Sequence, residues 1–84
     1  MEMVKSEVKK IIIDEKLERY NFFENRNNHE DEIVVNFADG KYYVYATDEK
    51  ASKITGSEKF FDTENEALEN FIKRLRALNI LKKE

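Results

Sequence analysis

The chain has 84 residues, of which 18 are Asp or Glu and 15 are Lys or Arg, with one His and no Cys, Pro or Trp. A chain of this length builds one domain, taken as residues 1–84, around a single modest core, which excludes a large internal pocket and an elaborate enzyme. The lack of cysteine excludes disulfides, a thiolate nucleophile and the cysteine-containing zinc sites. No apolar run approaches a membrane span or a signal peptide, so we expect a cytoplasmic protein without membrane contact.

Charge is unevenly distributed along the chain. Residues 14–69 carry fifteen acidic and seven basic side chains, whereas residues 70–84 carry one acidic and five basic ones. An acidic surface repels phosphate backbones and attracts basic proteins. The middle of the chain therefore favours a basic protein partner over nucleic acid, although a merely solvated acidic surface accounts for the same pattern.

The N-terminal region is predicted to form a helix followed by a short strand. Residues 3–19 place apolar side chains on two sides of a helix, so this helix either kinks near Asp14 or is covered on both sides. Residues 20–24 are typical of a short strand, in which Phe22 and Phe23 address opposite faces.

The clearest local signal is a β-hairpin. Residues 32–38 and 41–47 are rich in β-branched and aromatic side chains, and Asp39-Gly40 between them is typical of a type I′ turn. This turn fixes the register of the two strands. The register puts six apolar or aromatic side chains on the core face: Ile33, Val35, Phe37, Tyr42, Val44 and Ala46.

The C-terminal half is predicted to contain a turn, a strand and a long helix. Residues 47–51 resemble a capped helical turn, and residues 57–61 resemble a further strand. Thr63 and Glu66 match a capping box at the start of the helix, and Asn79 is predicted to end it in the left-handed conformation. The apolar stripe of this helix consists of Leu68, Phe71, Ile72, Leu75 and Leu78.

These elements predict an α+β fold: an N-terminal helix, a three- to four-stranded antiparallel sheet and a C-terminal helix. We expect both helices on the sheet face that carries Ile33 and Val35. The opposite face would stay partly open, with Val34, Tyr43 and Tyr45 on it. Such aromatic rows are typical of protein interfaces, but they also stack nucleotide bases or are simply covered by a loop.

The predicted register also gathers carboxylates at one end of the sheet, because Ile33 pairs with Ala46. The residues before the first hairpin strand and after the second are therefore expected close together in space. Such a cluster binds a basic partner, or its members only cap a helix and lie in a solvated loop. The five carboxylates are Glu30, Asp31, Glu32, Asp48 and Glu49.

No residue pattern indicates catalysis. His29, the only histidine, lies in the polar stretch 25–31, which predicts a solvated loop. The carboxylates show no spacing that selects an acid-base pair, and no phosphate loop, nucleophile elbow or metal motif accompanies them. We therefore expect no catalytic residue, no metal and no cofactor.

Four stretches carry a resemblance to a known family: Asp39-Gly40, residues 42–45, residues 47–51, and the series Phe60, Glu66-Ala67-Leu68, Phe71-Ile72 and Leu75. Together they resemble the immunity protein 59 family, small immunity proteins of bacterial polymorphic toxin systems. The resemblance covers roughly residues 30–78 and implies a cytosolic, noncatalytic protein that binds and neutralises a cognate toxin. On that view the five carboxylates provide electrostatic complementarity, and Tyr43 and Tyr45 supply a buried anchor.

Two other classes remain open. Double-stranded RNA-binding domains also have the order helix, three strands, helix. They bind phosphates through basic residues at the N-terminal end of the last helix. Here that end carries Asp62, Glu64 and Glu66, whose negative charges would repel phosphates. An antitoxin resembling the HicB type would also be an inhibitor, but the residues after position 79 are not expected to supply its DNA-binding appendage.

Overall fold

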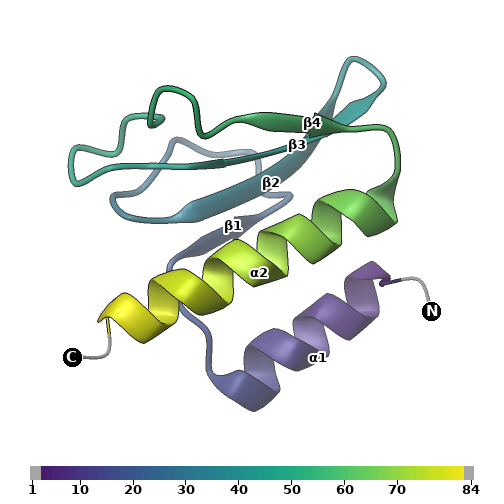
Figure 1. The fold of residues 1–84 in the computed structure, drawn as a ribbon, viewed down its shortest axis with the longest axis horizontal. Coiled ribbons are helices and arrows are strands. Elements are labelled where there is room, and N and C mark those ends of the chain that lie inside the picture. Colours follow the sequence, from purple (N-terminus) through teal and green to yellow (C-terminus); the bar gives the residue numbers. More distant parts are fainter. Residues whose placement is uncertain (1–2, 83–84) are drawn as a thin grey trace.

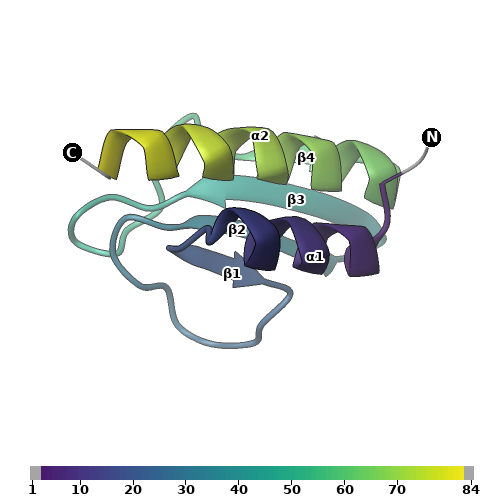
Figure 2. The same ribbon diagram turned by 90° about the horizontal axis from the view of Figure 1, so that it is seen from below.

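The computed structural model describes residues 3–82, which form two helices and one four-stranded sheet (Figure 1). Figures 1 and 2 show both helices on one face of the sheet, which confirms the expected α+β fold and its one-sided helical layer. The strand order is β1-β2-β3-β4. The elements are α1 (Lys5–Glu15), β1 (Tyr20–Phe22), β2 (Ile33–Ala38), β3 (Lys41–Ala46), β4 (Lys59–Phe61) and α2 (Glu64–Lys82).

The sheet is mixed, so the prediction of a purely antiparallel sheet was wrong. β1 pairs with β2 in parallel, with Tyr20 opposite Ile33, whereas the other two pairings are antiparallel. Parallel neighbours need a crossover connection, which is commonly a helix. Here residues 23–32 make the crossover as a loop. The composition of this polar stretch predicts a loop but does not reveal that it returns the chain in the same direction.

The β2–β3 hairpin has the predicted register and turn. Val35 lies opposite Val44, in the middle of six paired positions. Asp39 and Gly40 have φ angles of 52° and 78°, and two successive positive values are what a type I′ turn requires. Alternation along both strands then separates a helix-covered face from an open face.

The core lies between the two helices and the covered face of the sheet. Val35, Phe71 and Leu75 are fully buried there. Burying a side chain of this kind contributes about 1.5–3 kcal/mol, so this layer is the main source of stability in a domain this small. Phe37 points to the same face next to the hairpin turn, where it is 49% exposed and packs against the Tyr42 ring.

α1 is shorter than the predicted helix over residues 3–19. It ends at Glu15, because Lys16 adopts a left-handed conformation and its N–H bonds back to the last turn. Leu17 lies past the helix end and is buried, whereas Ile13 stays 74% exposed. The apolar residues on the second side of the predicted helix are thus explained by its early end: Ile13 is exposed, and Leu17 packs into the core beyond the helix.

β1 also ends earlier than predicted. Phe23 has a φ of 58°, so the extended backbone stops after Phe22. The two rings form an edge-to-face pair with centroids 5.1 Å apart, and both pack against the core. The prediction that they address opposite faces was wrong, because alternation holds only while the backbone remains extended.

α2 begins as predicted but continues past its predicted end. The Glu66 N–H donates to the Thr63 hydroxyl (3.3 Å), which in turn donates to the Glu66 carboxylate (3.0 Å). Asn79 does not end the helix. It is buried within α2, where Oδ1 accepts from the Glu18 N–H (2.8 Å) and Nδ2 donates to the Glu18 carbonyl (2.9 Å). This side chain therefore ties the connection after α1 to α2.

Candidate protein-binding surface

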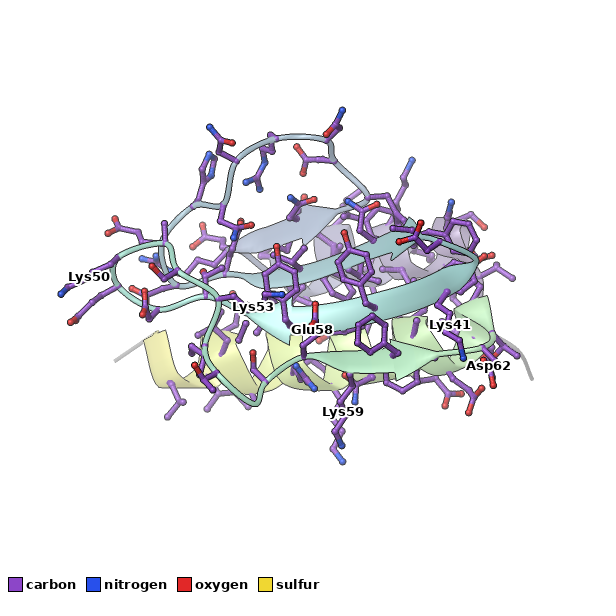
Figure 3. All side chains as sticks on the ribbon, turned by 90° about the horizontal axis from the view of Figure 1, so that it is seen from above. Lys41, Lys50, Lys53, Glu58, Lys59 and Asp62 are labelled. Atoms are coloured by element: carbon purple, nitrogen blue, oxygen red, sulfur yellow. The ribbon has the colours of Figure 1, made fainter. Side chains whose placement is uncertain are left out.

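The sheet face turned away from the helices is aromatic at its centre, and Figure 3 looks onto it. Tyr43 and Tyr45 stack on β3 with ring centroids 6.0 Å apart and planes 4° from parallel. Phe60 lies opposite Tyr43 on β4, with centroids 6.3 Å apart, and is 60% exposed. We call these three rings the aromatic face. Large aromatic side chains are enriched in the centres of protein interfaces.

Two ion pairs border the aromatic face at opposite ends of β3 and β4 (Figure 3). Lys41 Nζ lies 2.8 Å from Asp62 Oδ1, and Lys53 Nζ lies 2.9 Å from Glu58 Oε2. The hydrogen bond to Glu58 raises the pKa of Lys53, whose ammonium also lies 5.2 Å from the Tyr45 ring centroid. Exposed pairs of this kind add little to folding stability, but they fix charges around the rings.

The two tyrosine hydroxyls have different environments. Burial raises the pKa of Tyr43, with smaller contributions from Tyr45 and Glu58. The Tyr43 hydroxyl therefore stays neutral at physiological pH and can both donate and accept a hydrogen bond. The Tyr45 hydroxyl donates to Asn28 Oδ1 (2.8 Å) and so contacts the loop between β1 and β2.

Residues 23–32 cover the other half of this sheet face. Asn21 and Val34 point away from the helical layer, yet each is only 2% exposed. Asn21 accepts from the Glu24 N–H (2.8 Å), and the Asn36 amide donates to the Glu24 carbonyl (3.3 Å). The loop thus shields β1 and the start of β2 and removes Val34 from the surface, whereas the face is open over β3, β4 and the end of β2, where Ala38 is exposed.

Glu32 is 2% exposed and holds this loop from inside. Its carboxylate accepts from both terminal nitrogens of Arg26 (2.9 and 3.2 Å) and from the His29 N–H (2.9 Å). This bidentate contact raises the pKa of Arg26. Glu32 therefore lies apart from the exposed carboxylates with which the sequence analysis grouped it, because its charge is satisfied within the chain.

The other four carboxylates of the predicted cluster do meet at one end of the sheet. The Asp31 N–H donates to the Asp48 carbonyl (3.0 Å), which joins the loop to the end of β3. Glu30 and Glu49 are exposed and line one shallow depression, together with Lys50. We call these four carboxylates the acidic end. A surface with this excess of negative charge attracts basic groups.

Residues 47–51 form a tight turn, so the prediction of a helical turn was wrong. Asp48 accepts from the N–H groups of Lys50 (2.8 Å) and Ser52 (3.0 Å), and Ala51 has a φ of 63°. The backbone donors of Ser52 and then Lys50 lower the pKa of Asp48 below its ordinary 3.8. Its carboxylate therefore caps the turn and also contributes charge to the acidic end.

Phe60 was not predicted as a surface residue. A strand at this position was predicted, but its pairing with β3 was not. Only that pairing puts Phe60 opposite Tyr43. The available signal was alternation, because Phe61 packs against the core and its neighbour must point the other way. His29 is held through its backbone and keeps an exposed side chain. Within residues 3–82, no cluster of potential metal ligands is found.

Residues 3–82 thus form an α+β fold with one face of its sheet packed and the other partly open and aromatic. A model of the immunity protein 59 family matches residues 1–83, and the chain belongs to that family. No curated protein and no solved structure matches it. In the part of the chain that the structure describes, neither helix has the length and hydrophobicity of a membrane span.

Proposed function

We propose that this protein binds and neutralises a cognate toxin of a bacterial polymorphic toxin system by direct protein contact, in the cytoplasm and without catalysing a reaction. Membership of the immunity protein 59 family supports the immunity role. The observation that carries the binding mode is the aromatic face, where three rings lie together on a surface that neither α1 nor α2 covers.

The aromatic face supplies the anchor of the complex. Aromatic rings bury a large area, and they are over-represented among the few residues that dominate binding energy. Tyr43, Tyr45 and Phe60 are each partly or largely exposed in the free protein. The two bordering ion pairs form a polar rim of the kind that surrounds such anchors and excludes water.

The acidic end supplies long-range attraction. Glu30, Asp31, Asp48 and Glu49 lie at the end of the sheet next to Tyr45, in a chain whose formal net charge is −3. Such a field speeds association with a basic surface and weakens as salt is added. The counterpart on the toxin is therefore a basic surface.

Co-expression with the product of the open reading frame immediately upstream tests this function. The tagged chain should co-purify with that product and restore the growth of cells that express it. A toxic product that is neither captured nor neutralised contradicts the proposal.

A matched pair of double variants tests the site. Tyr45→Ala with Asp48→Lys should lower the affinity at least about thirtyfold. Ile80→Ala with Glu69→Lys makes the same kinds of change at exposed positions of α2 and should leave the affinity unchanged. Unchanged affinity in a folded Tyr45/Asp48 variant would move the interface to α1 or to the basic end of α2.

A further inference from the structure

Residues 24–31 form neither strand nor helix, so individual contacts determine where they lie. The loop brings two parts of the candidate surface together. Asn28 contacts the aromatic face by accepting from the Tyr45 hydroxyl (2.8 Å), and Glu30 belongs to the acidic end. Whatever holds the loop therefore also sets the placement of the acidic end relative to the aromatic face.

Arg26 and Glu32 hold the loop at its base. Besides its two contacts with Glu32, the Arg26 guanidinium donates to the carbonyls of Tyr20 (3.1 Å) and Asn27 (3.0 Å). Arg26 thus joins β1, the loop and the residue that precedes β2. An unpaired carboxylate as buried as Glu32 would be costly, which keeps this pair formed in the folded protein.

Thr47 holds the loop from the side of β3. Its hydroxyl donates to the His29 carbonyl (2.8 Å) and accepts from the Glu32 N–H (2.9 Å). Because the Glu32 carboxylate accepts from the His29 N–H, both backbone groups of His29 are fixed. The residue before it, Asn28, is thereby placed against Tyr45.

From these contacts we propose that the aromatic face and residues 24–31 form one composite docking surface, which the ion pair between Arg26 and the buried Glu32 preorganises. This inference rests on the proposed function and deepens it, because Arg26 and Glu32 act as positioning residues. The surface is apolar at its centre and acidic at one side, so it fits a toxin surface with an apolar centre flanked by Lys or Arg. A loop that is already ordered costs less entropy on binding.

The first test uses the free protein. Glu32→Gln keeps the size of the side chain but removes the charge that holds Arg26. Hydrogen exchange followed by NMR should show about a tenfold loss of protection at the His29 amide, with Val44 and Leu75 unchanged. Glu15→Gln is the matched control, because it breaks a bidentate Arg–Glu pair in the helical layer.

The second test uses the co-purified toxin. Glu32→Gln should lower its affinity at least about tenfold, Arg26→Lys should lower it less, and Glu15→Gln should leave it unchanged. Asn28→Ala removes the hydrogen bond to Tyr45 without touching the Arg26–Glu32 pair and should also weaken binding. The loss of affinity in the double variant Asn28→Ala with Glu32→Gln should be smaller than the sum of the two separate losses, because both changes release the same loop.

The outcomes separate this inference from the proposed function. If Glu32→Gln loosens the loop and leaves the affinity intact while Tyr43→Ala weakens binding, the positioning role is overturned and the proposed function stands. If neither variant weakens binding, the proposed surface is itself wrong. An unchanged His29 amide in Glu32→Gln also overturns the inference. Should that variant fail to fold, Arg26→Lys decides: an unchanged His29 amide and unchanged affinity overturn the inference, and lost protection with weakened binding supports it.

Discussion

The two faces of the sheet are built from different side chains and held in different ways. On the covered face, aliphatic residues such as Val35 and Val44 are fully buried under the helices. On the other face, Tyr43 and Phe60 remain accessible over β3 and β4, and a polar loop shields β1 and the start of β2. Since neighbouring residues of one strand point to opposite faces, the same strands pack against the helices on one side and carry the proposed toxin-binding surface on the other.

The same substitution on the two faces should give the largest contrast. Phe71→Ala removes a fully buried ring and should lower the free energy of unfolding by about 3–5 kcal/mol. Phe60→Ala removes a ring that is 60% exposed and should cost less than about 1 kcal/mol. Urea unfolding followed by circular dichroism measures both. Equal losses would contradict the division between the faces.

Tyr45→Ala, on the open face, should weaken toxin binding strongly but lower the stability of the fold only slightly. We expect the affinity for the toxin to fall by about 2 kcal/mol or more by calorimetry, because the variant removes a stacked ring and the hydroxyl that contacts Asn28. The midpoint of unfolding should change far less than in Phe71→Ala. A Tyr45 variant that is as unstable as Phe71→Ala would show that the open face also carries the fold.

Asn79→Leu, in the helical layer, should lower stability without changing toxin affinity. It removes two hydrogen bonds to the Glu18 backbone and leaves that backbone without its partner, which should cost about 1–3 kcal/mol of stability. Toxin affinity should be unchanged in the folded fraction. Glu69→Gln, at an exposed position of the same helix, is the control and should leave the unfolding midpoint in place.

Asp48 should give the smallest effect, one that depends on pH. Its pKa is lower in the folded protein than in the unfolded chain, so its contribution to stability is present above the ordinary 3.8 and is lost as pH falls through the folded value. Asp48→Asn should therefore lower the thermal midpoint more at about pH 7 than at about pH 2. Equal shifts at both pH values would mean that the charge of this carboxylate does not stabilise the turn.

Local signals predicted the parts of the fold that local chemistry determines. The Asp39-Gly40 turn and the alternation beside it gave the whole register of the hairpin. The direction of β1 escaped prediction because it depends on the path of the crossover loop. The role of Asn79 escaped prediction because its partner, Glu18, lies 61 residues away in the sequence.

The candidate site divides in the same way. Alternation was enough to put Tyr43 and Tyr45 on the face opposite the helices. Glu32 was grouped with surface carboxylates because its burial depends on Arg26, which reaches it from within the loop. Phe60 was missed because its place depends on a pairing between β3 and β4 that no turn motif indicates.

The separation of folding from recognition is tested most directly by two double variants measured for both toxin affinity and unfolding. Tyr43→Ala with Phe60→Ala removes rings from the aromatic face. Ile13→Ala with Ile80→Ala removes side chains that are 74% and 70% exposed on the helical layer. We predict that the first variant loses affinity and keeps most of its stability, and that the second keeps both. Weakened binding in the isoleucine variant, with full binding in the aromatic one, would contradict the account and place the interface on the helices.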